Sequence, residues 1–120
     1  MCKRALVQLS YAIGVAKPLS LFVETYGTEQ GKLDADDITS IIKIAFDCRP
    51  GAIAQSLALR EPKYQVTAAY CHFGREPYTK DGIKYFEWEN TKDLSHFNGM
   101  SSAQVAAALA SSSYLTKWVD

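Results

Sequence analysis

Hydrophobic and polar residues alternate with a period of two near the start of the chain. Across residues 5–13 the odd positions are all apolar or aromatic, whereas the even positions include Gln8 and Ser10. This pattern predicts a strand with one buried face. Pro18 then interrupts the pattern, because proline has no N–H to donate to a sheet. A second alternating stretch over residues 19–24 is expected to pair antiparallel with the first as a hairpin, since the connection is short.

The hydrophobic period becomes helical after a cluster of acidic residues. Asp34, Asp36 and Asp37 stand where carboxylates can accept hydrogen bonds from the free N–H groups of a first helical turn. The apolar residues that follow are spaced at i, i+3, i+4, i+7 and i+8: Ile38, Ile41, Ile42, Ala45 and Phe46. A helix with one apolar stripe is therefore expected to lie on the hairpin. The carboxylates resemble a metal-binding loop only superficially, because no further oxygen ligands continue the pattern.

Two shorter elements are predicted next. Pro50 suits the first position of a second helix, which is expected to end at Glu61-Pro62. The inner face of that helix would consist of apolar residues at helical spacing: Ile53, Ala54, Leu57 and Ala58. From Tyr64 to Tyr70 the even positions are again apolar or aromatic, so a third extended segment is expected there.

The last third of the chain predicts a hairpin and a helix. Asp81-Gly82 suits a tight reversal, and the aromatic run over residues 85–88 is typical of a short strand. Ser101 and Gln104 match a capping box, which predicts a C-terminal helix over the alanine-rich stretch that follows. Because alanine side chains bury little area, docking of this segment would depend on its larger side chains: Tyr114, Leu115 and Trp118.

Composition and charge narrow the class of protein. The chain has 120 residues, 48% of them hydrophobic, which suits one domain with a single core. Lys plus Arg and Asp plus Glu both number 13, so no net charge favours nucleic acid or an anionic membrane as a partner. No apolar run approaches the roughly 20 residues of a membrane span. Cys2, Cys48 and Cys71 are widely spaced and follow no secretory leader, which favours a reduced, cytoplasmic protein.

The sequence contains no motif for unaided catalysis. It has no phosphate-binding P-loop, no dinucleotide fingerprint, no zinc-protease motif and no hydrolase nucleophile elbow. Cys71 and His72 could form a metal-ligand pair or a thiol with its base, but a zinc site needs about four clustered ligands and the only other histidine is His96. We therefore interpret both as structural residues. No catalytic residue and no metal ligand is assigned.

Four short motifs give the chain a family resemblance. They are L-S-Y-A-I-G-V-A-K-P-L-S at 9–20, E-T-Y-G-T at 24–28, F-D-C-R-P-G at 46–51 and T-A-A-Y-C-H-F-G-R at 67–75. In this order and at these separations they resemble the C-terminal part of S-adenosylmethionine synthetases, also called methionine adenosyltransferases. The resemblance covers residues 2–89. It implies an α+β fold with an antiparallel or mixed sheet and helices packed on one face, as part of one domain of a three-domain enzyme.

The resemblance also implies how the chain is organised. Residues 1–92 would be a fragment of the synthetase C-terminal domain, and residues 93–120 a helical C-terminal extension. Family members are several times longer and have active sites between two subunits, so the complete enzyme is expected to bind ATP and methionine and to form a homodimer or tetramer. The chain would be a truncated product of such an enzyme. We expect it to be inactive alone.

The family reaction forms S-adenosylmethionine from ATP and methionine and releases phosphate and pyrophosphate. It uses two Mg²⁺ ions and a K⁺ ion, whose ligands belong to family segments upstream of the matched part. Ile13 corresponds to the isoleucine of the family's S-Y-A-I-G motif, which lines the substrate pocket near the methionine and adenosyl groups. Ile13 is therefore the one substrate-binding residue that the resemblance implies. Periodicity alone would place it on the buried face of the first strand.

The fourth motif carries two further expectations. Cys71 stands where the family has a glycine, and if that glycine has a positive φ, a side chain there costs about 1 kcal/mol. Arg75 is expected to form an exposed ion pair with Glu76 or Glu87.

Two alternatives to a catalytic fragment remain open. The chain could be a non-catalytic interaction module that binds a synthetase subunit or itself, because missing neighbouring strands would leave apolar sheet surface exposed. It could also be an unrelated small α/β ligand-binding domain, which the general order of strands and helices would allow.

Overall fold

The structure, a computed structural model, describes residues 1–118 apart from the side chain of Leu115. These residues form two compact units. The first unit consists of Met1–Pro50 together with the segment from Leu94 onward, and the second unit consists of Gly51–Asp93. Helices and small antiparallel sheets make up both, so the predicted α+β class is confirmed.

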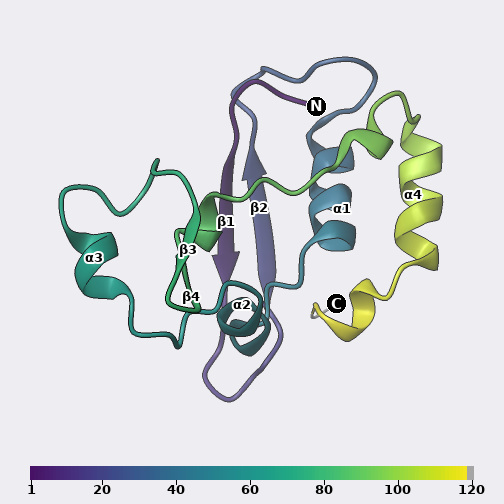
Figure 1. Cartoon of the computed structure of the whole chain (residues 1–120). Coiled ribbons are helices and arrows are strands. Elements are labelled where there is room, and N and C mark those ends of the chain that lie inside the picture. The colour runs from purple at the N-terminus through teal and green to yellow at the C-terminus, as the bar shows by residue number, and fades with distance from the viewer. Residues whose placement is uncertain (119–120) are drawn as a thin grey trace. The chain divides into compact units, whose positions relative to one another are not determined.

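The first unit contains the predicted N-terminal hairpin (Figure 1). Strand β1 (Leu6–Ser10) pairs antiparallel with β2 (Ser20–Glu24), and Val7 lies opposite Val23. The prediction of a first strand through residue 13 is wrong: the ladder ends at Ser10. Pro18 and Gly14, which has a φ of +78°, lie in the connection and prevent the ladder from continuing.

Helix α1 (Ala35–Ala45) covers the hairpin as predicted. Its capping box is complete, because the Asp37 N–H donates to Asp34 Oδ1 at 2.9 Å and the Asp34 N–H donates to Asp37 Oδ2 at 3.2 Å. Ile38 and Ile41, from the predicted apolar stripe, are buried. Capping is thus the role of these two carboxylates.

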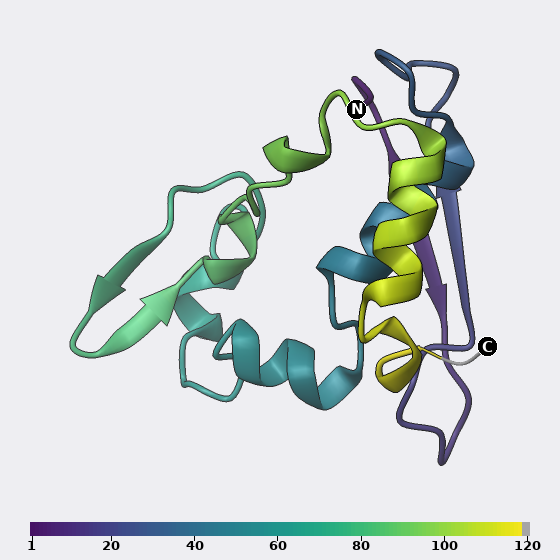
Figure 2. The ribbon, with the colours of Figure 1, turned by 90° about the vertical axis from the view of Figure 1, so that its right-hand side faces the viewer.

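The predicted C-terminal helix, α4 (Ser102–Ser111), begins at a capping box formed by Ser101 and Gln104. It packs along α1, as Figure 2 shows. A buried cluster joins the two helices and a preceding 3₁₀ turn, η2 (Ser95–Phe97); its members are Leu33, Ile41, Phe97 and Val105. After α4 a second 3₁₀ turn, η3 (Tyr114–Thr116), leads to Trp118, which is buried as predicted. The predicted docking of the Leu115 side chain lies outside the described residues.

The second unit contains α2 (Pro50–Ser56) and α3 (Tyr64–Ala68). Helix α2 starts at the predicted proline but ends before Glu61-Pro62, and none of its residues is fully buried. The prediction of a third extended segment is wrong, because α3 occupies that place. The N–H groups of Val66 and Thr67 both donate to the Lys63 carbonyl at 3.2 Å. Lys63 and Thr67 are both buried, and their i, i+4 spacing is that of one helix face. The hydrophobic pattern did not reveal this face, because both side chains are polar.

The second predicted hairpin is present in the second unit. Strand β3 (Tyr78–Lys80) pairs antiparallel with β4 (Ile83–Tyr85), and Asp81 and Gly82 form the turn with φ values of +53° and +77°. The aromatic strand predicted over residues 85–88 is wrong beyond Tyr85. Phe86 has a φ of +59° and turns the chain into η1 (Glu87–Glu89).

Candidate functional site

The connection between β1 and β2 carries Ile13, the one predicted substrate-binding residue. The Leu19 N–H donates to the Ser10 carbonyl at 2.8 Å and closes the base of this loop, and the Val15 N–H donates to the Ala12 carbonyl at 3.2 Å. Ile13 lies inside the turn that the Ala12–Val15 hydrogen bond closes, and its side chain is fully exposed, with a relative accessibility of 106%. The loop therefore presents a bare apolar side chain rather than a core residue.

Tyr11 anchors the start of this loop to the chain after α1. Its hydroxyl donates to the Cys48 carbonyl at 2.7 Å. Burial raises the pKa of Tyr11, and the nearby Cys48 raises it further, so the phenol stays protonated and remains a donor. Burial, followed by the Asp47 carboxylate, likewise raises the pKa of the Cys48 thiol. A protonated thiol is a poor nucleophile, which agrees with a structural role for Cys48.

The motif at 46–51 contains a bidentate ion pair. Arg49 Nε donates to Asp47 Oδ1 at 2.9 Å, and Arg49 Nη2 donates to Asp47 Oδ2 at 2.6 Å. The hydrogen bonds from Arg49 are the main cause of the lowered pKa of Asp47. The pair fixes the chain immediately before Pro50, the first residue of α2. The charges of Asp47 and Arg49 therefore neutralise each other within the motif.

The motif at 24–28 forms a turn that holds the N-terminal segment. Tyr26 and Gly27 have φ values of +56° and +68°, and the Thr28 hydroxyl donates to the Thr25 carbonyl at 2.7 Å. Thr28 Oγ1 also accepts from the Arg4 N–H at 3.1 Å, and the Arg4 guanidinium lies 4.4 Å from the centre of the Tyr26 ring. These contacts are structural and leave no group placed for chemistry.

The motif at 67–75 is also a folded turn. Tyr70, not Cys71, has the left-handed conformation, with a φ of +69°, so the expected strain at Cys71 is absent. The Cys71 Sγ lies 2.7 Å from the Phe73 carbonyl, to which it donates. His72 stacks on Trp88 with ring centres 4.5 Å apart, and Trp88 Nε1 donates to the His72 carbonyl at 3.0 Å. His72 is thus held as an aromatic packing partner.

Arg75 does not make the predicted ion pair within the part of the chain that the structure describes. Arg75 Nη1 donates to the Ala69 carbonyl at 3.1 Å and lies 3.4 Å from the Val66 carbonyl. Its guanidinium stacks over the Phe86 ring, 4.4 Å from the ring centre. Arg75 thus makes a cation–π contact with a buried ring and donates through Nη1 to backbone carbonyls, in place of the predicted ion pair.

Sequence reasoning missed Lys63, whose side chain is completely buried. Its Nζ donates to the Lys84 carbonyl in β4 and lies 3.4 Å from Glu61 Oε2. The Lys84 N–H donates to the same carboxylate at 2.9 Å, and this hydrogen bond is the first cause of the lowered pKa of Glu61. No local sequence signal marks a buried lysine, because lysine usually lies at the surface.

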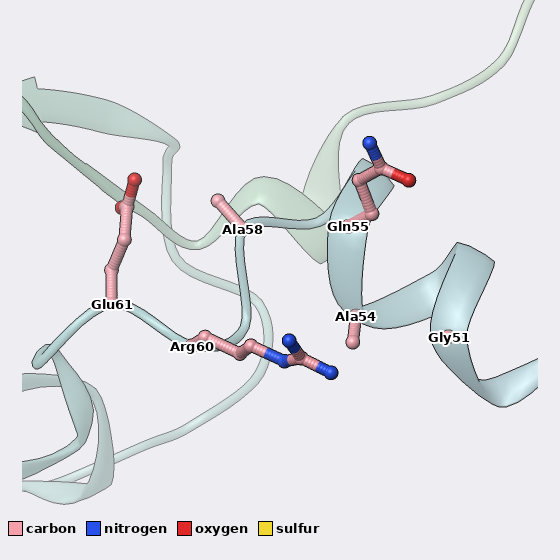
Figure 3. A pocket seen from close by; sticks show the side chains of 6 residues that line it. All are labelled: Gly51, Ala54, Gln55, Ala58, Arg60 and Glu61. Carbon is pink, nitrogen blue, oxygen red and sulfur yellow. The ribbon is translucent and has the colours of Figure 1, made fainter.

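The second unit also has an open pocket of about 630 Å³ beside α2 (Figure 3). It is lined by Gly51, Ala54, Gln55, Ala58, Arg60 and Glu61. Figure 3 shows the Arg60 side chain extending toward Ala54, whereas Glu61 points in another direction. The pocket is thus lined by one guanidinium, one carboxylate, one amide and small residues, and its lining contains no nucleophile with a neighbouring base.

The described residues do not fit a metal centre. Across residues 1–118 no three side chains of His, Cys, Asp or Glu gather closely enough to hold an ion. Two of the acidic residues near α1 are committed to its capping box. Mg²⁺ prefers oxygen ligands, and residues 1–118 contain no cluster of three acidic side chains that could supply them. Within residues 1–118 no helix has the length and apolar character of a membrane span.

Comparison with known proteins connects these motifs to one family. The family model described as "S-adenosylmethionine synthetase, C-terminal domain" matches residues 1–90. The S-adenosylmethionine synthase of Cytophaga hutchinsonii is 45% identical over 102 residues, covering 74% of this chain and 24% of that protein. The S-adenosylmethionine synthase of Bacteroides thetaiotaomicron is 47% identical over 89 residues, covering 74% of this chain and 21% of that protein.

The matched region contains all four motifs, the Met1–Pro50 part of the first unit and nearly all of the second unit, but not the segment from Leu94 onward. The chain spans about a quarter or less of the length of these curated relatives. A match over three-quarters of the chain overturns the alternative of an unrelated ligand-binding domain. On this evidence the chain belongs to the S-adenosylmethionine synthetase family, through the C-terminal domain of that family.

Proposed function

We propose that residues 1–92 serve as part of the C-terminal domain of a methionine adenosyltransferase, with residues 93–120 as a helical extension. In a complete enzyme this domain would form part of the substrate-pocket wall and scaffold. The enzyme would form S-adenosylmethionine from ATP and methionine and release phosphate and pyrophosphate. The family match over residues 1–90 is the observation that carries this proposal.

The exposed loop with Ile13 is the part of the domain that would meet substrate. An apolar side chain in a binding site excludes water and contacts apolar parts of the substrate without exchanging a proton. Ile13 suits this role, since it projects from a loop whose base is fixed by hydrogen bonds at Leu19 and Tyr11. It would lie near the methionine and adenosyl groups.

The charged part of the reaction would depend on groups outside this chain. A leaving triphosphate requires cations and N–H donors arranged around its oxygens. In the complete enzyme Mg²⁺ and K⁺ would supply part of that charge, held by ligands on other segments. The chain would act in the cytoplasm within a homodimer or tetramer of full-length subunits, and alone it would not turn over substrate.

A domain exchange tests this function. The matching C-terminal part of the Bacteroides thetaiotaomicron synthase would be replaced by residues 1–90 of this chain, and S-adenosylmethionine would be measured by chromatography. The chimera is expected to form product, because the exchanged domain supplies the same wall. The isolated 120-residue chain, assayed with ATP, methionine, Mg²⁺ and K⁺, should release no phosphate above the blank. A correctly folded chimera without product, or turnover by the isolated chain, would refute the proposal.

A second candidate function is a non-catalytic interaction module that binds a synthetase subunit or itself. The observation that favours it is the number of large apolar side chains exposed on the first unit. Those on or next to the hairpin are Leu6, Val7, Tyr11, Ile13, Val15, Leu19, Phe22 and Tyr26. Exposed apolar side chains that gather into a patch mark interaction sites on soluble proteins.

A further inference from the structure

The loop that carries Ile13 is fixed at both of its ends. Pro18, near the far end, is fully buried, and the Leu19 N–H donates to the Ser10 carbonyl at 2.8 Å and closes the base. Tyr11, at the near end, is the first residue after the β1 ladder and is tied down by its hydroxyl. The exposed turn lies between these two anchors, so its direction depends on both.

A four-residue turn presents Ile13 immediately after the Tyr11 anchor. The Val15 N–H donates to the Ala12 carbonyl at 3.2 Å, which places Ile13 and Gly14 at the two central positions of the turn. Gly14 has a φ of +78°, which glycine adopts without strain at the third position of such a turn. Only Ala12 separates Tyr11 from Ile13, so a change in the backbone direction at Tyr11 changes the direction of the whole turn.

The acceptor of the Tyr11 hydroxyl belongs to a peptide group that is held on both sides. The Cys48 carbonyl accepts from Tyr11 at 2.7 Å, and the Arg49 N–H of the same peptide group donates to Asp47 Oδ1 at 3.3 Å. The Arg49 guanidinium also donates to both oxygens of that carboxylate. Charge-assisted bidentate pairs of this kind have a defined geometry, so the Cys48 carbonyl is a fixed acceptor for Tyr11.

Tyr11 depends on its hydroxyl bond because its ring is only partly covered. The residue is 42% exposed, so packing constrains it less than it constrains a core side chain. A phenol hydrogen bond to a carbonyl fixes the direction of the ring and, through it, the backbone at the start of the loop. Losing one such bond loosens a loop without unfolding a domain, because a single hydrogen bond contributes a small part of the total stability.

We propose that Tyr11 is a positioning residue for the substrate wall: its bond to Cys48 holds the turn in the direction in which Ile13 meets substrate. Without this bond the turn samples several directions, and only the molecules with Ile13 in place bind substrate tightly. The apparent dissociation constant rises by the inverse of that fraction, whereas turnover at saturation is unchanged, because bound substrate selects the ordered turn. This role rests on the proposed function, since Ile13 must contact substrate for its direction to matter.

Steady-state kinetics of the chimeric synthase tests this role. Tyr11→Phe should raise the KM for methionine about fivefold while kcat stays within about twofold of the parent chimera. Tyr64→Phe is the matched control: that hydroxyl also donates to a backbone carbonyl, the one of Leu59, and the residue is 43% exposed, but it lies in the second unit and holds no part of the loop. An unchanged KM in Tyr11→Phe, or an equal rise in Tyr64→Phe, would refute the positioning role.

A second substitution determines whether the effect passes through Ile13. In a chimera that already carries Ile13→Ala, adding Tyr11→Phe should raise the KM by less than about twofold, because the side chain that Tyr11 positions has been removed. The same rise of about fivefold in both backgrounds would mean that Tyr11 acts by another route and would overturn the proposal.

Backbone ¹⁵N relaxation of the 120-residue chain distinguishes failure of this role from failure of the proposed function. Tyr11→Phe should lower the order parameters of residues 12–15 from about 0.85 to below about 0.6, whereas Tyr64→Phe should not. Equal order parameters in Tyr11→Phe and the wild type refute the anchor, whether or not the chimera is active. A folded parent chimera without product refutes the proposed function and with it the substrate role of Tyr11, while the relaxation data still decide whether Tyr11 fixes the loop.

Discussion

Replacing Phe97 with alanine should lower the free energy of unfolding of the first unit by about 3–5 kcal/mol. Phe97 is 3% exposed and packs with Leu33, Ile41 and Val105 in the buried cluster. Two of these partners belong to the region around α1 and one belongs to α4, so the ring joins the C-terminal segment to the matched domain. Small domains have total stabilities of about 5–15 kcal/mol, so the loss would be a large fraction of the total.

Hydrogen exchange followed by mass spectrometry measures this effect on α1 itself. Amides of α1 should exchange roughly a hundredfold faster or more in Phe97→Ala, since each 1.4 kcal/mol corresponds to a factor of ten. Phe46→Ala is the matched control immediately after α1, where the residue is 37% exposed and the change should be smaller. If α1 keeps its wild-type protection in Phe97→Ala, the C-terminal segment does not stabilise the first unit.

Replacing Phe86 with alanine should destabilise the second unit by a similar amount, about 3–5 kcal/mol. Its ring is fully buried, lies beneath the Arg75 guanidinium and meets the Trp88 ring at a centre distance of 5.7 Å. The backbone of Phe86 is left-handed, with a φ of +59°, which costs a residue with a Cβ about 1 kcal/mol. Phe86→Gly should therefore be about 1 kcal/mol less destabilised than Phe86→Ala.

Exchange of the amides in β3 and β4 distinguishes these variants. Phe73→Ala is the control, because that ring is 67% exposed and its loss should change protection little. Equal protection in Phe86→Ala and the wild type would contradict the packing role of the ring. Faster amide exchange in Phe86→Gly than in Phe86→Ala would contradict the claim that the left-handed backbone at position 86 is strained.

The elements that could be predicted from sequence are those with local signals. Asp34 with Asp37, and Ser101 with Gln104, are capping boxes whose partners are three residues apart, and both are present. The Asp81-Gly82 turn was predictable for the same reason, because its residue types suit positive φ. A short stretch of chain holds all the information that these features need.

The wrong predictions concern elements that tertiary contacts decide. The five residues of α3 alternate as a strand would, and the burial of Lys63 and Thr67 at helical spacing depends on the rest of the fold. The Lys63 side chain gains its partner from β4, 21 residues away, which no local pattern reveals. Likewise the stacking of Arg75 on Phe86 depends on how the second hairpin folds back.

The candidate site was accessible only through the family resemblance. Periodicity assigns Ile13 to the buried face of the first strand, whereas the ladder ends at Ser10 and leaves Ile13 exposed. An exposed isoleucine has no reactive group, so its side-chain chemistry does not indicate a binding site. Its position in the S-Y-A-I-G motif remains the reason to assign it to substrate.

The most direct test of the pocket-wall role is the value of kcat/KM for the chimeric synthase carrying Ile13→Asp. A carboxylate placed against the apolar parts of methionine and the adenosyl group would be desolvated without a partner, so kcat/KM should fall by about 100-fold, equivalent to roughly 3 kcal/mol. Val66→Asp, which adds the same charge at an exposed valine of α3, should leave kcat/KM within about threefold of the parent chimera. A folded Ile13→Asp chimera that retains the parental kcat/KM would contradict the assignment of Ile13 to the substrate pocket.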